Sequence, residues 1–241
     1  MKIETMSSTR KIWMGLGLLA FAHASSAALI TLNGNGFSVS YDDAQEVQYG
    51  QGFLSGSLDT IYFQPSAFSA LSGGSPASTA APLQLTFTID PGYAFAGLNF
   101  TERGDYFLLG GGTVGVDASL QAVNTDTAVS VVLSLAPSAP LDLTGASTPW
   151  MAVGSIAAGL GVPQSLQLTL DNELLASAPA GDLSFIQKTY VGFQVVTRAQ
   201  PASSVPEPSS WALLAAGMLA ALMAGRRRPR IPPGMRFGRC T

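Results

Sequence analysis

The chain has 241 residues, of which 47% are hydrophobic, and its formal net charge at pH 7 is −3. Most basic residues lie near the two ends, so the part between Leu29 and Ser204 has three basic and thirteen acidic residues, a net charge of −10. This acidic balance argues against nucleic acid as a partner, because phosphates are bound by lysine and arginine. It also argues against binding to an anionic membrane surface.

The N-terminal segment has the three parts of a secretory signal peptide. Basic residues come first, the short apolar stretch Ile12–Phe21 follows, and small residues are frequent in Ala22–Ala28. The apolar stretch is too short for a membrane span, and the region after it suits cleavage. We therefore predict that residues 1–27 form a signal peptide, which signal peptidase removes by cleavage after Ala27 or Ala28.

The central part of the chain alternates apolar and polar residues, which is the period of half-buried β-strands. The clearest example is Leu83–Ile89, where every second residue is apolar. Other strands are predicted at Phe37–Tyr41, Val129–Leu135, Leu166–Leu170 and Val191–Val195. Weaker patterns indicate further strands at Ile61–Phe63, Ala94–Phe100, Tyr106–Leu109, Val114–Ala122 and Leu183–Ile186.

Turn signals separate these strands, among them Gly34–Gly36, Asp90–Gly92 and Gly110–Gly112. Strands with one apolar and one polar face at such spacing indicate an all-β domain, an antiparallel β-sandwich or jelly roll. We place this domain at residues 28–199 and a flexible linker at residues 200–204.

Two stretches inside the domain do not read as strands. Ser66–Pro82 is rich in Ser, Ala, Gly and Pro, so it is predicted to be an exposed loop. Trp150–Leu160 is predicted to form a short helix, although glycines interrupt it.

The C-terminal segment has three parts in a fixed order. The tripeptide Pro206, Glu207, Pro208 comes first, the uncharged apolar stretch Ser209–Gly225 follows, and a cluster of arginines begins at Arg226. As a helix, the apolar stretch would be about 25 Å long, enough for a thin bilayer core, so a single transmembrane helix is predicted. The arginines would stay on the cytoplasmic side, together with residues 231–241.

This order resembles the PEP-CTERM sorting signal of Gram-negative bacteria, and the resemblance covers residues 205–230. It implies that an exosortase, a membrane transpeptidase, recognises Pro206, Glu207 and Pro208 and removes the tail. The apolar stretch would hold the chain in the inner membrane, and Arg226, Arg227 and Arg228 would stop translocation. The alternative is a simple C-terminal membrane anchor with a proline-containing stalk. A second stretch, Gly92–Tyr106, looks like the middle of other PEP-CTERM β-domains, which implies an acidic Gly-Asp-Tyr turn.

Residue usage excludes several classes of enzyme. The only histidine is His23, in the predicted signal peptide, and the only cysteine is Cys240, beyond the arginines. The exported part therefore has neither residue, which excludes disulfides, Ser-His-Asp and Cys-His hydrolases, and zinc sites with His or Cys ligands. We expect no enzymatic activity, no cofactor and no metal.

Acidic residues leave two chemical alternatives open. A glycosidase needs two carboxyl groups several ångströms apart, and calcium takes carboxylate oxygens. The candidate glycosidase carboxyl groups are Asp42 and Asp43 with Glu46, Glu102 with Asp105, and Asp171 with Glu173. The candidate calcium ligands are Asp42 with Asp43, or Asp171 with Glu173. Each group also stands at the end of a strand pattern, where aspartate is a common turn residue.

Exposed aromatic side chains could bind sugars, which stack on aromatic rings. The candidates are Tyr41, Tyr49, Tyr62, Tyr93, Tyr106, Trp150 and Tyr190. Most of them lie on strand patterns, where a place in the core is the simpler expectation.

The resemblance implies an exported, non-enzymatic protein of the cell surface or extracellular matrix, associated with exopolysaccharide and biofilm. The expected partners are signal peptidase, the exosortase, the inner membrane before processing, and exopolysaccharide, with no nucleic acid. The alternative is a carbohydrate-binding, lectin-like module of the matrix. A matrix glycosidase is a third, weaker hypothesis.

Overall fold

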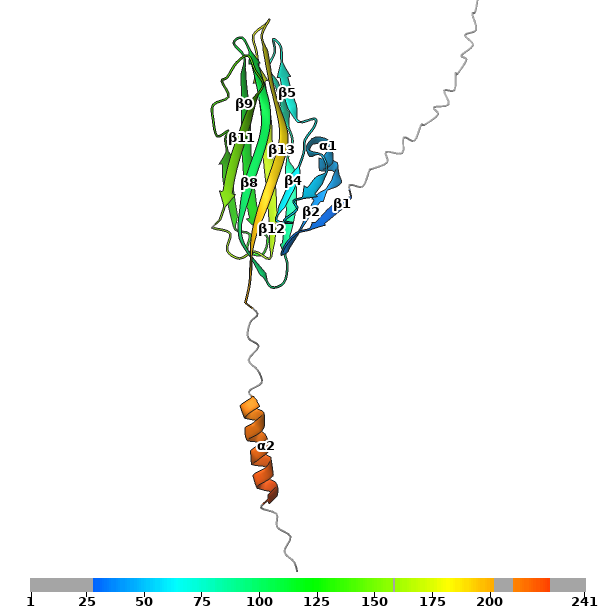
Figure 1. Cartoon of the computed structure of the whole chain (residues 1–241), viewed down its shortest axis with the longest axis vertical. Helices are drawn as coiled ribbons and strands as arrows, with labels where there is room; N and C mark the ends of the chain where they lie inside the picture. Colours follow the sequence, from blue (N-terminus) through cyan, green and yellow to red (C-terminus); the bar gives the residue numbers. More distant parts are fainter. Residues whose placement is uncertain (1–27, 158, 202–209, 226–241) are drawn as a thin grey trace, which may run out of the picture.

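The computed structural model describes residues 28–157, 159–201 and 210–225. Two antiparallel β-sheets face each other and enclose a core, as the alternating sequence predicts (Figure 1). The fold class is therefore an all-β, antiparallel sandwich, and the prediction of fold class is confirmed.

Sheet A has seven strands, and six of them follow one another in the order β1-β2-β7-β12-β9-β10 while β6 pairs with β12. The strands are β1 (Leu29–Asn33), β2 (Phe37–Asp42), β6 (Ala77–Ala80), β7 (Leu83–Ile89), β9 (Thr113–Asn124), β10 (Ser130–Leu135) and β12 (Ser165–Ser177).

Sheet B has six strands in the order β11-β8-β13-β4-β3, with β5 paired to β13. The strands are β3 (Gly52–Leu54), β4 (Thr60–Phe63), β5 (Ser69–Ser72), β8 (Tyr93–Leu109), β11 (Thr148–Ile156) and β13 (Leu183–Ala199). The two long strands β8 and β13 lie side by side along most of their length, and they form the centre of this sheet (Figure 1).

The inward-facing residues of both sheets form one continuous core. In β7 the apolar residues of the alternation are buried and the polar ones are half-buried or exposed, as the sequence predicts. Burial alternates in the same way along β12, whose inward positions are apolar except for Asn172. The largest core side chains are aromatic: Phe37, Tyr41, Tyr49, Phe63, Phe68, Phe87, Phe100, Tyr106 and Phe193. They are fully buried, and burial of large apolar surfaces is the main force that holds the two sheets together.

A bulge in β13 sets the direction of the side chains near its middle. The register against β8 shifts between Lys188 and Tyr190, so that one extra residue, Thr189, stands opposite no partner. Before the bulge Lys188 points inward, and after it Val191 does. The two residues between them, Thr189 and Tyr190, are not buried. The bulge therefore places a lysine in the core and a tyrosine on the outer face within two residues.

Three local predictions are wrong. Residues 148–156 form strand β11 rather than a helix, because the stretch pairs with β8 and buries Trp150 and Ala152 in alternation. The predicted loop Ser66–Pro82 contains β5 and β6, which pair with β13 and β12. The predicted Gly-Asp-Tyr turn is absent, because β8 continues through these residues.

The sequence also did not predict the one-turn helix α1 (Glu46–Tyr49), which follows a 3₁₀ turn at Asp43–Gln45. The Asp42 carboxylate caps this turn by accepting a hydrogen bond from the Ala44 backbone N–H at 2.8 Å. The helix places Tyr49 in the core, where its hydroxyl donates to the Ala81 carbonyl oxygen at 2.7 Å. Burial raises the pKa of Tyr49 above its usual value, and the negative charges of Glu102 and Asp171 raise it further.

The C-terminal apolar stretch forms helix α2 (Ser210–Gly225), so the predicted helix is present with nearly the predicted bounds. It has 16 residues and is therefore about 24 Å long. Among the described residues, no helix combines the length and apolar character needed to cross a membrane. The helix is thus found where it was predicted.

Candidate functional site

Most residues of the predicted sorting and cleavage sites lie outside the described residues. This holds for Ala27 and for Pro206, Glu207, Pro208, Arg226, Arg227 and Arg228. Ala28 is described and exposed, and its backbone N–H donates to the Asp43 carboxylate at 2.9 Å. The roles predicted for these residues stay predictions.

Helix α2 lies between the tripeptide and the arginines, and it has no charged residue. Its large apolar side chains from Leu213 to Met223 are 53 to 72% exposed. The helix therefore has no polar face. A helix that is apolar all round is expected where protein or lipid surrounds it rather than water.

The core between the sheets contains three polar side chains that contact one another. Glu102 comes from β8 and Lys188 from β13, both in sheet B, and Asn172 comes from β12 in sheet A. The exposed fractions are 0% for Glu102, 1% for Lys188 and 5% for Asn172. We call these three residues the buried triad.

One carboxylate oxygen of Glu102 joins the other two members of the triad. Lys188 Nζ donates to Glu102 Oε2 at 2.5 Å, and Asn172 Nδ2 donates to the same oxygen at 2.6 Å. The second oxygen, Glu102 Oε1, has no hydrogen-bond partner, and Asn172 Oδ1 has none either. Buried polar atoms without partners are rare in folded proteins, and each one calls for an explanation.

Aromatic side chains surround the lysine. Its Nζ lies 5.0 Å from the centroid of the Phe68 ring and 6.0 Å from that of Trp150. Burial in these surroundings lowers the pKa of the Lys188 amine, and the attraction of Glu102 opposes that shift. Sequence reasoning had paired Glu102 with Asp105 instead, whereas the structure pairs it with Lys188.

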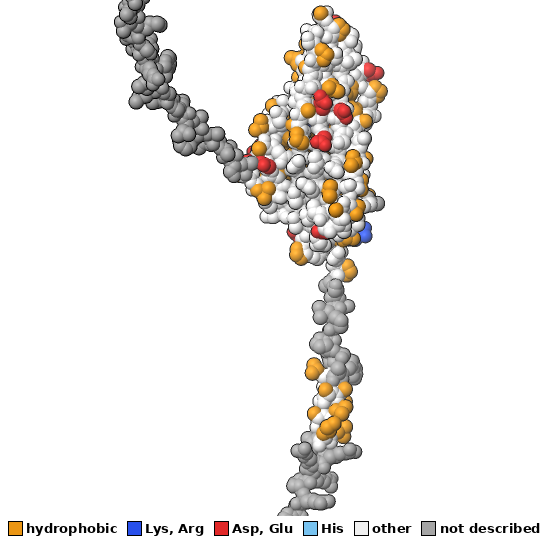
Figure 2. Space-filling model, turned by 180° about the vertical axis from the view of Figure 1, so that it is seen from behind, with side chains coloured by type: hydrophobic (Ala, Val, Ile, Leu, Met, Phe, Trp, Pro, Cys, Tyr) orange, Lys and Arg blue, Asp and Glu red, His pale blue; other side chains and the backbone are white. Residues whose placement is uncertain are grey.

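Three other acidic groups that the sequence singled out make hydrogen bonds inside the domain. Asp42 and Asp43 accept hydrogen bonds from backbone N–H groups, and Glu46 accepts one from the Tyr41 hydroxyl at 3.0 Å. Asp171 and Glu173 line a shallow hollow on sheet A with Asp117, which stands directly opposite Glu173. Acidic side chains gather on the face shown in Figure 2. In the part of the chain that the structure describes, no three His, Cys, Asp or Glu residues are placed to hold a metal ion.

Aromatic side chains form a row on the outer face of sheet B. Phe53 on β3 stands opposite Tyr62 on β4, with ring centroids 5.8 Å apart. Tyr62 stacks on Tyr190 of β13 at 5.9 Å with an interplanar angle of 17°. The guanidinium carbon of Arg103, on β8, lies 4.4 Å from the Tyr190 ring centroid. We call these four residues the aromatic row.

A glycine leaves room for the Tyr190 ring over the outer face of sheet B. Gly192 stands opposite Tyr62, and a side chain at this position would collide with the Tyr190 ring. Of the other aromatic candidates, Tyr41, Tyr49, Tyr106 and Trp150 are buried, and only Tyr93 is partly exposed away from the row.

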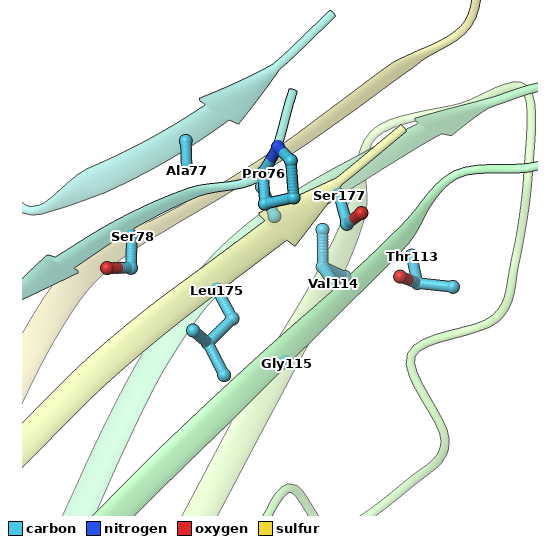
Figure 3. Close-up of a pocket in the computed structure, with 9 residues that line it drawn as sticks. Pro76, Ala77, Ser78, Thr113, Val114, Gly115, Leu175 and Ser177 are labelled. Carbon is cyan, nitrogen blue, oxygen red and sulfur yellow. The ribbon is translucent and has the colours of Figure 1, made fainter. Parts of the chain in front are cut away.

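The surface also has shallow grooves. One of about 400 Å³ lies over β6, β9 and β12, and small or apolar residues such as Ala77, Val114 and Leu175 line it (Figure 3). A larger one of about 570 Å³ lies beside β8 and β11, with Arg103 and Asp105 at its wall. Neither groove brings together groups that resemble a catalytic set.

Comparison with protein families identifies the C-terminal segment. Residues 204–228 match the family model of the PEP-CTERM protein-sorting motif. The chain is a PEP-CTERM protein. The match covers the tripeptide, α2 and the first arginines, which are the residues that suggested the resemblance. The PEP-CTERM motif implies export, a membrane-anchored sorting intermediate and processing by an exosortase.

This PEP-CTERM protein was also compared with curated proteins and with solved structures. A comparison with curated proteins finds no match. Among solved structures, the carbohydrate-binding module TmCBM61 in complex with beta-1,4-galactotriose is 15% identical, covering 70% of this chain and 89% of that one with a TM-score of 0.19. A structure from a study of promiscuous carbohydrate-binding modules of the β-sandwich superfamily is 8% identical, with coverages of 69% and 86% and a TM-score of 0.21. TM-scores this low do not support an inference about function from either structure.

Proposed function

We propose that this PEP-CTERM protein is a non-enzymatic component of the cell surface or extracellular matrix, associated with exopolysaccharide. Signal peptidase would remove residues 1–27, and an exosortase would recognise Pro206, Glu207 and Pro208 while α2 is held in the inner membrane. The observation that carries this proposal is the motif match at residues 204–228, directly after a domain whose last strand ends at Ala199.

The composition of the domain supports a role without catalysis. The part between Leu29 and Ser204 has no histidine and no cysteine. Among its acidic residues, Asp42, Asp43 and Glu46 accept local hydrogen bonds, and Glu102 is paired with a lysine. We therefore expect no reaction on an external substrate, whereas signal peptidase and the exosortase act on this protein.

Substitution of the tripeptide tests the sorting proposal. We expect Glu207→Ala to stop processing, so that the full-length protein accumulates in the inner membrane instead of the extracellular fraction. The measurement is an immunoblot of fractionated cells of the native host. Glu173→Ala is the matched control, because it makes the same change on a half-buried glutamate of the domain. Equal amounts of both variants outside the cell would contradict the proposal and favour a simple anchor.

The aromatic row favours a second candidate function, a carbohydrate-binding module of the matrix. Sugar rings present C–H groups that pack on aromatic faces, and a charged guanidinium nearby can donate hydrogen bonds to hydroxyl groups. The row offers Phe53, which is 41% exposed, with Tyr62 and Tyr190 beside it and Arg103 at its end.

A glycan array tests this second function. We expect Tyr190→Ala to lower binding of matrix glycans at least about fivefold, taking as a guide the roughly 1–3 kcal/mol that a nucleic-acid base gains by stacking on one aromatic ring. Leu175→Ala on the outer face of sheet A is the control, because it removes an exposed apolar side chain far from the row. Wild-type protein that binds no host glycan, or equal binding by both variants, would exclude the aromatic row as a glycan site.

A further inference from the structure

The buried triad combines three groups whose chemistry is complementary. Lys188 has a primary amine, which is a nucleophile once it loses its proton. Asn172 has a carboxamide carbon, which an amine can attack. Glu102 has a carboxylate that can take a proton from the lysine. All three are buried among apolar side chains, where the charged form of an amine is disfavoured.

The contacts hold the amine and the amide together. Lys188 Nζ and Asn172 Nδ2 both donate to Glu102 Oε2, at 2.5 and 2.6 Å, so the two nitrogens lie within about 5 Å of each other. A lysine side chain has a flexible stem of four carbons. Rotation about its bonds lets the amine approach the neighbouring carboxamide without a change in the backbone. The triad therefore holds a nucleophile and an electrophile next to each other, with a proton carrier in contact with both.

We propose that Lys188 and Asn172 form an intramolecular isopeptide bond, with Glu102 as the residue that carries the proton. First, Lys188 Nζ gives a proton to Glu102 Oε2. The free electron pair of Nζ then attacks Asn172 Cγ, and a new C–N bond forms. One proton moves from Nζ to Nδ2, the bond between Cγ and Nδ2 breaks with its electron pair on the nitrogen, and ammonia leaves.

This reaction needs no oxidant and no further reactant. One C–N bond forms and one breaks, and Glu102 keeps the proton that came from Lys188. The product has no buried charge, because an amide and a carboxylic acid replace the ion pair. Protonation also makes Glu102 a hydrogen-bond donor, whereas the carboxylate oxygen Oε1 and the amide oxygen Asn172 Oδ1 are now two acceptors without partners. An acid proton on Oε1, donated to Asn172 Oδ1, would give both of these atoms a partner.

The bond would connect the two sheets of the sandwich. Asn172 belongs to β12 in sheet A and Lys188 to β13 in sheet B (Figure 1). The exported part of the chain has no cysteine and so cannot form a disulfide. A bond between an amine and an amide is the covalent link that its residues do permit.

Protease digestion of the denatured full-length protein tests the proposal. Trypsin cleaves after lysine only if the amine is free, so we expect complete protection at Lys188. Cleavage after Arg103 and Arg198 in the same sample is the internal control. A protease that cleaves after glutamate separates Asn172 from Lys188 at Glu173. We therefore expect a branched peptide that contains both residues and is lighter than its two parts by one ammonia.

Two variants make the test specific. Asn172→Asp would form the same bond with loss of water, so its branched peptide has the same mass as that of the wild type. Glu102→Gln would leave Lys188 open to trypsin. Wild-type protein that is cleaved at Lys188 as fully as at Arg103 would overturn the proposal. So would loss of ammonia at Asn172 without a branched peptide, because this indicates a cyclic imide formed by Asn172 alone.

Discussion

We expect Glu102→Leu to lower the free energy of unfolding by at least about 3–5 kcal/mol, because it leaves the buried amine of Lys188 without its carboxylate and prevents the proposed bond to Asn172. Both side chains are fully buried, with no exposed side-chain surface. Removing one member of such a pair lowers the free energy of unfolding by more than the intact pair adds to it. The reason is that the remaining charge can neither reach water nor find a new partner. Chemical denaturation of the variant and the wild type measures the difference.

The double variant Glu102→Leu, Lys188→Met separates the effect of the charge from that of the changed volume. It removes both charges, and we expect it to be more stable than Glu102→Leu alone although it has one substitution more. A double variant less stable than the single one would mean that the lysine charge is compensated by other groups, such as the rings of Phe68 and Trp150.

The second large effect is expected at Gly104, where we predict that Gly104→Val lowers the stability by at least about 3 kcal/mol. Gly104 is buried in β8 between Trp150 of β11 and Lys188 of β13. A side chain there would overlap the Gln187 backbone carbonyl and the Trp150 indole nitrogen. These two atoms are hydrogen-bonded to each other at 3.1 Å, so neither can move without breaking that bond.

Gly115→Ala is the control for this prediction. Gly115 also lies in a long central strand, β9, but an added carbon would meet Leu175 only at an ordinary distance of 3.7 Å. We expect this variant to be as stable as the wild type or slightly more so, because alanine has less freedom to lose on folding. Thermal unfolding followed by circular dichroism compares the two variants. Equal stabilities would mean that β8 and β13 can separate at this point.

Alternation along the sequence was sufficient to predict the fold class, because in a sandwich each strand buries one face. It failed where pairing, rather than local pattern, decides the structure. Residues 148–156 contain proline and glycine and look unlike a strand, yet they pair with β8 over nine residues. Strands β5 and β6 lie in a stretch of small residues, and their pairing with the ends of β13 and β12 makes them strands.

The buried triad was missed although the alternation contained a signal for it. Lys188 continues the inward positions of Ser184 and Ile186, and Asn172 stands between the inward residues Leu170 and Leu174. Glu102 likewise follows the inward residue Phe100. A lysine, a glutamate and an asparagine at inward positions of three strands suggest a buried polar cluster. The bulge after Lys188 obscured the pattern. Before it the even-numbered residues of β13 point inward, and after it the odd-numbered residues do.

The aromatic row was also beyond sequence reasoning. The order of strands in sheet B brings Phe53, Tyr62 and Tyr190 together from three strands, two of them far apart in the chain. Alternation alone assigned most tyrosines to the core, which is right for Tyr41, Tyr49 and Tyr106. It cannot tell an outer position from an inner one across a bulge.

The intact mass of the exported protein, purified from its native host, tests the sorting function most directly. The proposal predicts a species that lacks residues 1–27 and everything beyond the Pro206–Pro208 region, including α2. An exported species that still contains Trp211 to Arg228 would contradict it. The C-terminal segment would then be an anchor, and the matrix role would lose the observation on which it depends.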